Sequence, residues 1–173
     1  MDRFLPWVKA VLAVTPETWR RLTRELPPEL LNLPPAPGQW SALECLQHLI
    51  DTERVFHFRL GCLLEGKDFP AFDPDKQGKA PDRSRPAAEL ADELARLRAD
   101  SLKALAAVDP SDFGRTARHQ ELGPVTLKQM VHEWAAHDLN HTVQAERAMM
   151  QPFIAGCGPW QPYFADHRVQ ASG

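Results

Sequence analysis

The sequence contains little cysteine, no long apolar run and no concentration of basic residues. Its three cysteines, Cys45, Cys62 and Cys157, form no C-x-x-C pair, and their odd number argues against a disulfide framework. We therefore predict a cytoplasmic protein in a reducing compartment. No apolar run approaches the ~20 residues of a membrane span. The net charge is −3 and Lys and Arg are scattered, so we expect neither a membrane nor a nucleic acid as partner.

Several catalytic signatures are also missing. The sequence has no G-x-S-x-G motif, no Gly-rich phosphate loop and no dinucleotide-binding fingerprint. Ferritin-like di-iron proteins carry Glu-x-x-His on each of two helices, whereas the nearest segment here is Asp138-Leu-Asn-His141, without a second copy. The zinc-protease motif H-E-x-x-H fails because one residue too many separates His132 from His137. The histidines must therefore be judged by their spacing.

The composition that remains is that of one globular domain. The chain has 173 residues, of which 43% are apolar and 25% charged, so we predict a single domain spanning residues 1–173. Helical periodicity dominates, and no segment alternates convincingly as a β-strand would. Long helices are expected at about residues 3–25, 41–66, 86–108 and 126–150. Four such helices, with a wide connection on each side of the third, predict an all-α four-helix bundle.

Local signals support these limits. S-x-x-E at Ser41 and T-x-x-Q at Thr126 form capping boxes that begin the second and fourth helices. Thr15-Pro16 suits a restart within the first helix, with Thr15 as its N-cap.

The connections carry information of their own. The proline-rich residues 27–39 cannot be regular helix. The long polar loop 67–85 is of the kind that often borders a site. The C-terminal tail, residues 151–173, is expected to pack on the bundle.

Two histidines of the fourth helix share a face. At ~100° per residue, His132 and His137 point about 140° apart, whereas His137 and His141 point about 40° apart, one turn above the other. They interrupt an otherwise apolar stripe that contains Met130, Trp134, His137, His141, Ala145 and Ala148. Two neutral imidazoles on a core face need several polar partners, which a shared metal ion supplies. A hydrogen-bonded pair of core histidines is the alternative.

His48 is the third candidate ligand. It lies well inside the second helix and meets the other two histidines if the second and fourth helices are neighbours. Three imidazoles with open coordination positions are the ligands of a catalytic divalent site. The remaining histidines are expected at the surface; they are His57, His119, His132 and His167.

Further residues lie at helical spacing from these ligands. Acidic and amide groups three or four residues away are candidates to bind the free ring nitrogens, and they are Asp51, Glu133, Asp138 and Gln144. A solvated charge is the alternative for Glu133 and Asp138. Cys45 is a candidate pocket residue or ligand, although such a cysteine is more often simply buried. Trp134 is expected in the core or in a pocket wall.

Three segments in this order resemble the DinB-like family, which includes the YfiT-like proteins. They are W-S-A-L-E-C-L-Q-H-L-I-D-T-E (40–53), G-P-V-T-L-K-Q-M-V (123–131) and W-A-A-H-D-L-N-H-T-V-Q (134–144). The resemblance implies an up-down-down-up four-helix bundle with one divalent metal ion, nickel, zinc, manganese or iron, on His48, His137 and His141. It also implies a homodimer, because many family members are dimers.

The resemblance implies two enzymatic functions. Relatives of known activity are transferases or isomerases that use a low-molecular-weight thiol, such as bacillithiol, mycothiol or glutathione, and others are described as hydrolases. Our leading hypothesis is a metal-dependent enzyme acting on a small molecule, with a thiol-dependent S-transferase favoured narrowly over a hydrolase. No catalytic residue beyond the metal ligands is assigned. The alternative is a non-catalytic bundle that binds a small ligand or a partner.

Overall fold

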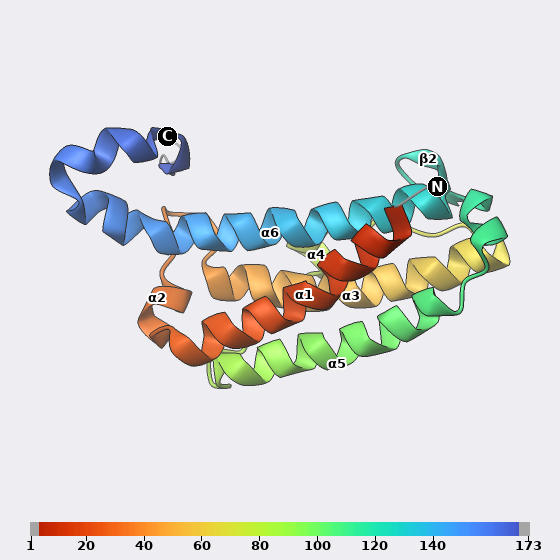
Figure 1. Ribbon diagram of the computed structural model, residues 1–173, viewed down its shortest axis with the longest axis horizontal. Coiled ribbons are helices and arrows are strands. Elements are labelled where there is room, and N and C mark those ends of the chain that lie inside the picture. Colours follow the sequence, from red (N-terminus) through yellow and green to blue (C-terminus); the bar gives the residue numbers. More distant parts are fainter. Residues whose placement is uncertain (1–3, 170–173) are drawn as a thin grey trace.

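Four long helices dominate the computed structural model, which describes residues 4–169 (Figure 1). In chain order the elements are α1 (Phe4–Glu25), α2 (Pro28–Asn32), α3 (Ala42–Glu65), α4 (Pro74–Gln77), α5 (Ala87–Ala106), the 3-10 helix η1 (Pro110–Gly114), the strands β1 (Thr116–His119) and β2 (Gly123–Thr126), α6 (Leu127–Gly156) and the 3-10 helix η2 (Gly158–His167). The predicted helical bundle is confirmed. The ends of the predicted domain range, residues 1–3 and 170–173, lie outside the described residues.

The helices that carry the three candidate ligands begin at the predicted capping boxes. Ser41 Oγ accepts a hydrogen bond from the Glu44 backbone N–H at 3.3 Å, and the Glu44 carboxylate accepts one from Ser41 N–H at 2.7 Å. Thr126 and Gln129 exchange the same two bonds at 3.1 and 2.8 Å. These bonds satisfy N–H groups that have no partner within the helix, so the local sequence fixes where α3 and α6 start.

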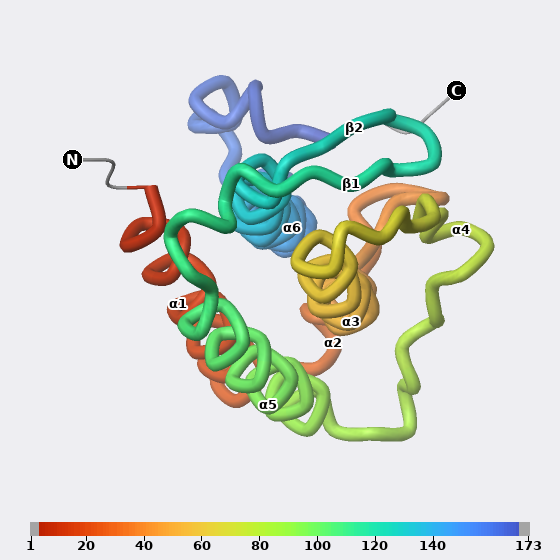
Figure 2. Tube along the Cα trace, turned by 90° about the vertical axis from the view of Figure 1, so that its right-hand side faces the viewer, coloured from red at the N-terminus to blue at the C-terminus, as the bar shows by residue number. Residues whose placement is uncertain are grey.

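The helices are connected up-down-down-up, as predicted. α1 and α6 run in one direction, and α3 and α5 run in the other (Figure 1). Viewed from the end, each long helix contacts two others: α1 and α3 both pack on α5 and on α6 (Figure 2). α3 and α6 are therefore antiparallel neighbours, and this arrangement brings the beginning of α3 beside the middle of α6.

A short β-hairpin corrects the expectation that the chain has no strand. β1 and β2 pair antiparallel, with Ala117 opposite Val125. Phe69 adds a parallel bridge to His119. Strands of four residues are too short for alternation to be visible in the sequence, and their partner, Phe69, lies about 50 residues away along the chain. The hairpin lies beside one end of α6 and α3 (Figure 2).

Pro16 does not restart the first helix, which is a second correction. α1 continues through Pro16, and Thr15 Oγ1 donates to the carbonyl of Val11 at 3.0 Å instead of capping a new helix. Proline lacks the N–H that would bond to the carbonyl of Leu12, four residues earlier. That carbonyl accepts a hydrogen bond from Arg98 Nη1 at 2.7 Å, so α5 supplies the missing donor.

Two other boundaries differ from the prediction. The proline-rich connector contains the short helix α2, which begins with Pro28 at a first-turn position where no N–H is needed. α6 extends to Gly156 and contains Pro152, beyond the predicted end near residue 150. η2 then turns back beside α6 (Figure 1), where Arg147 Nη2 donates to the Asp166 carbonyl at 3.0 Å.

The apolar core consists of two clusters along the bundle. One contains Phe56, Leu60 and Trp134, and the other contains Leu46 and Ala145. Polar side chains of α3 and α6 also contact each other, His48 with His137 and Glu53 with Trp134, and this polar belt contains the candidate ligands. No helix within residues 4–169 is both long and apolar enough to cross a membrane.

Candidate metal site

Three imidazoles from two helices converge in the polar belt. α3 contributes His48, and α6 contributes His137 and His141. One ligand nitrogen of each lies within 4.8 Å of those of the other two. His48 Nε2 and His137 Nε2 are 3.1 Å apart, and the ring centre of His141 is 4.4 Å from both other rings. The structure thus brings together the three histidines selected from spacing.

The surroundings keep these imidazoles neutral. Burial and, to a smaller extent, the neighbouring imidazoles lower the pKa of His48 to about 4 and that of His137 to about 3. Burial also lowers the pKa of His141, against the opposing effect of its hydrogen bond to Gln144. A neutral imidazole has one nitrogen with a free lone pair. At neutral pH the cluster therefore offers three metal-binding nitrogens.

Gln144 selects the tautomer of His141. Its Oε1 lies 2.8 Å from His141 Nδ1. An amide oxygen only accepts hydrogen bonds, so Nδ1 carries the proton and Nε2 keeps the lone pair. Of the residues proposed to support a ligand, Gln144 therefore contacts an imidazole directly.

The nitrogen separations fit a shared divalent ion. Two imidazole nitrogens that each lie ~2.1 Å from one ion, at angles of about 90° to 110°, are about 3.0 to 3.4 Å apart. The 3.1 Å between His48 Nε2 and His137 Nε2 falls in this range. If both nitrogens present lone pairs, His137 Nδ1 carries a proton, and that atom is buried without a hydrogen-bond partner among the described residues. Three nitrogen ligands suit late first-row ions and leave coordination positions open.

Two predicted neighbours bind groups other than the imidazoles. Asp51 is buried and accepts hydrogen bonds from Gln47 Nε2 at 3.1 Å and from the backbone N–H of Lys79 at 2.8 Å. It therefore fastens the loop that follows α4 to α3. Asp138 is buried against Arg98, whose Nη1 lies 2.6 Å from its carboxylate.

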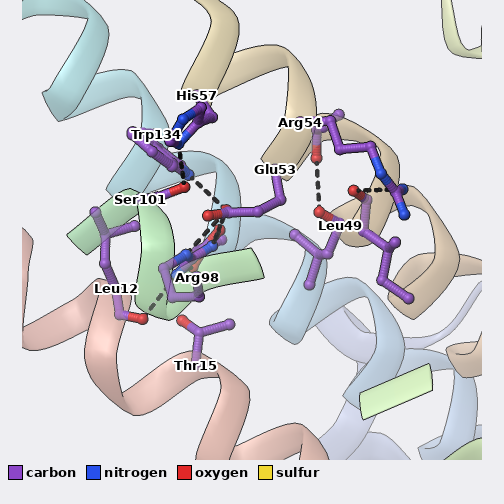
Figure 3. A network of polar contacts seen from close by, with 12 residues as sticks. Leu12, Thr15, Leu49, Glu53, Arg54, His57, Arg98, Ser101 and Trp134 are labelled. Atoms are coloured by element: carbon purple, nitrogen blue, oxygen red, sulfur yellow. Dashed lines mark hydrogen bonds and ion pairs between the residues drawn. The ribbon is translucent and has the colours of Figure 1, made fainter. Parts of the chain in front are cut away.

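The buried Arg98 joins all four long helices (Figure 3). It donates to Glu53 on α3 at 2.9 Å, to Asp138 on α6, and to the Leu12 carbonyl on α1. The indole N–H of Trp134 donates to the same Glu53 carboxylate at 3.2 Å. Both carboxylates thus bind one guanidinium beside the histidine cluster. This shared contact fixes the position of α3 relative to α6, the two helices that carry the imidazoles.

Cys45, Trp134 and Trp40 occupy different surroundings. Cys45 is fully buried in an apolar cluster, which raises the pKa of its thiol to about 12, so it stays protonated. Trp134 is fully buried and stacks on Phe56 with ring centres 5.1 Å apart, so it belongs to the core. Trp40 covers His48 and His141 at ring distances of 4.9 and 5.9 Å.

A cavity of about 450 Å³ opens beside the cluster, and His48 and His137 form part of its wall. α3, α6, the loop after α3 and the β-hairpin enclose the cavity. The residues that line it are His48, Thr52, Val55, Phe56, Arg59, Phe69, Phe72, Pro74, His119, Glu121, Leu122, Val125, Gln129, Met130, Glu133 and His137. The wall is largely apolar, and its volume lies within the range of small-molecule sites. Glu133, one of the predicted neighbours, lies in this wall.

Two residues of the wall were not identified from the sequence. His119 was expected at the surface, yet it is only 7% exposed, because β1 places it edge-on against Phe69 with ring centres 5.5 Å apart. Its Nδ1 accepts from the backbone N–H groups of Glu121 and Leu122. Arg59 carried a signal: it follows His48 by 11 positions, which on a helix returns to within about 20° of the same direction.

Comparisons with known proteins agree with this arrangement. A family model described as the DinB superfamily matches residues 12–145. A Bacillus mycoides (strain KBAB4) protein named "Putative metal-dependent hydrolase" is 24% identical over 139 residues, which are 79% of each chain. Among solved structures, YfiT from Bacillus subtilis matches with a TM-score of 0.75 and 16% identity over 88% of this chain and 89% of that chain. YfiT is described as "a probable metal-dependent hydrolase with an unusual four-helix bundle topology", and at this identity the likeness shows the fold alone.

Proposed function

Since the chain belongs to the DinB superfamily, we propose that it is a metal-dependent hydrolase whose divalent ion is held by His48, His137 and His141. The observation that carries this proposal is the convergence of three neutral imidazoles at the edge of a cavity. Structural metal sites usually have four protein ligands. Only three His, Cys, Asp or Glu side chains group around this point in the described part of the chain, which favours a reactive site.

The cavity supplies the other elements that hydrolysis needs. When bound, a divalent ion lowers the pKa of a coordinated water or polarises a carbonyl group. Glu133 lies in the same wall as His48 and His137, and its carboxylate is the candidate to accept the proton of the attacking water. Partial desolvation at the cavity wall raises the pKa of Glu133, Arg59 opposes this effect and Asp138 adds to it, so the carboxylate is a stronger base than a fully solvated glutamate.

Transfer to a low-molecular-weight thiol is the second candidate reaction. It requires the same open positions at the ion, which would favour the thiolate form of the co-substrate. None of the three cysteines lines the cavity, so the thiol would come from a second small molecule. The apolar wall suits the electrophile that such a thiol attacks. A cytoplasmic location and a homodimer accompany this proposal as predictions.

A paired assay tests the proposal. Protein reconstituted with zinc, nickel, manganese or iron is offered p-nitrophenyl esters without thiol, and in parallel monobromobimane with bacillithiol, glutathione or cysteine. We expect turnover in one arm that disappears with chelator, returns when the ion is restored and is missing in His137→Ala. Ester turnover supports hydrolysis, and thiol-dependent turnover supports transfer. Turnover that is undiminished after metal removal contradicts both.

A further inference from the structure

Arg59 is a partly buried cation that forms no direct ion pair with a carboxylate within residues 4–169. It lies on the face of α3 that carries His48, 11 positions along the chain, or about 16 Å along the helix axis. No acidic group of the described residues lies within 4.0 Å of its guanidinium. Arg98, which is fully buried in the bundle, contacts two carboxylates. Arg59 is therefore held differently from a structural arginine.

The partners of Arg59 leave much of its hydrogen-bonding capacity unused. Its Nη2 donates to the Pro70 carbonyl at 3.4 Å. Nη2 also lies 3.2 Å from His119 Nε2, but that atom carries the ring proton because His119 Nδ1 accepts from two backbone N–H groups, so it offers Arg59 no acceptor. Arg59 Nε is buried without a partner among the described residues. Its guanidinium lies over the Phe69 ring at 5.4 Å, which fixes the plane of the group. Burial lowers the pKa of Arg59 against the opposing charge of Glu133, yet a guanidinium remains charged in proteins. An anion in the cavity would balance this positive charge.

We propose that Arg59 binds the carboxylate of the substrate, so that the cavity accepts a small apolar carboxylic acid whose reactive end lies toward His48 and His137. This inference rests on the proposed function for the role of the histidines, but binding of the acid end depends on Arg59 alone. Arg59 Nη1 has no hydrogen-bond partner among the described residues, so its N–H groups are the donors that a carboxylate in the cavity would meet. The proposed substrate is therefore an acid whose hydrolysable or electrophilic group lies at the end of the molecule away from its carboxylate.

The charge of the wall favours a carboxylate over a phosphate. Arg59 is the one Lys or Arg residue in the cavity lining, and Glu133 lies in the same wall. A carboxylate carries a single negative charge, which one guanidinium balances. A phosphate monoester carries close to two and would face Glu133 without a second cation.

The cavity wall between Arg59 and the histidines suits an apolar chain of the substrate. Val55 and Phe56 of α3 and Met130 of α6 lie between the levels of Arg59 and His48, and Phe69 and Phe72 cover them from the following loop. These side chains bind an aryl or alkyl chain by burial from water. Such a chain would connect a carboxylate at Arg59 to a reactive group near the histidines.

Calorimetric titration with 4-phenylbutyrate tests the proposal on the full chain, both as purified and after chelator treatment. The chelated sample removes any ion that could bind the carboxylate at the histidines. The uncharged 4-phenylbutyramide and the phosphate ester 3-phenylpropyl phosphate serve as matched probes. Arg59→Met removes the guanidinium, and Arg59→Lys keeps a positive charge but loses the planar guanidinium group. Arg96→Met, at an exposed position of α5, is the control.

We expect the chelated wild type to bind 4-phenylbutyrate about tenfold or more tightly than the amide, and more tightly than the phosphate. Arg59→Met should lose this preference, Arg59→Lys should weaken binding, and Arg96→Met should match the wild type. Absence of binding to the wild type, equal binding of the amide, unchanged binding in Arg59→Met or Arg59-dependent preference for the phosphate would each overturn the proposal. The amide comparison needs no variant, so a folding defect cannot obscure it. Metal content of the same samples tests the histidine site separately.

Discussion

Arg98 donates two hydrogen bonds, of 2.6 and 3.1 Å, to Asp138, the residue that directly follows His137 in α6. The same guanidinium reaches Glu53 on α3 and the Leu12 carbonyl on α1. One buried side chain thus ties the three other long helices to α5. Because α3 and α6 carry the candidate ligands, this network determines whether the imidazoles meet.

Replacement of Arg98 should destabilise the fold strongly. Arg98→Met leaves the buried carboxylates of Glu53 and Asp138 without a cation, and breaking a buried ion pair in this way costs about 3–5 kcal/mol. Urea unfolding followed by circular dichroism measures this loss. Arg96→Met, two positions away on the exposed face of α5, should change the free energy of unfolding by no more than about 0.5 kcal/mol. Equal unfolding midpoints for the two variants would contradict a stabilising role for the network.

Gln144 should affect metal affinity without acting as a ligand. In Gln144→Leu, His141 Nδ1 loses the acceptor that fixes its tautomer, so we expect the affinity for zinc to fall about 10- to 100-fold. Competition with a zinc-binding dye measures the change. Gln144→Glu keeps an acceptor and should bind at least as tightly, while Glu146→Gln, at an exposed position of the same helix, is the control. An affinity unchanged in Gln144→Leu would show that the contact plays no part in binding.

The metal-free protein should lose stability as the pH falls below about 6.5. An imidazole in the unfolded chain has a pKa of about 6.5, whereas His48 and His137 in the fold have pKa values of about 4 and 3. Between these values the unfolded chain binds more protons, so acid favours unfolding. We expect a loss of about 1 to 3 kcal/mol per pH unit between pH 6 and 4.

Urea unfolding in chelator at several pH values measures this dependence. The double variant with His48→Gln and His137→Gln lacks both titrating groups and should show a shallower slope over the same range. If the double variant and the wild type lose stability in parallel, the two imidazoles are not the source of the pH dependence.

The candidate ligands could be predicted because helical geometry is local. Spacing alone put His137 and His141 on one face, and the capping boxes at Ser41 and Thr126 located both helices. That α3 and α6 are neighbours could not be read from periodicity, since it depends on how the four helices connect. The family resemblance supplied that connectivity.

The partners of the acidic residues and the cavity wall depend on contacts distant in the chain. Asp138 faces Arg98, 40 positions away, so spacing from His141 gave no indication of its partner. His119 is buried because β1 pairs with β2 and with Phe69, and the sequence of this strand has no apolar alternation. Spacing from His48 could predict the direction of the Arg59 side chain but not its role, since only the assembled cavity shows that no carboxylate of residues 4–169 forms an ion pair with it.

The metal content of the protein is the most direct test of the three-histidine site. Protein purified without a His-tag or chelator, and offered nickel, zinc, manganese and iron, is analysed beside His48→Ala, His137→Ala and Cys45→Ala, with circular dichroism to show that each variant is folded. We predict close to one ion per chain in the wild type and in Cys45→Ala, and loss of the ion in both histidine variants. No ion in any sample, or an undiminished ion in the folded histidine variants, would contradict the three-histidine site.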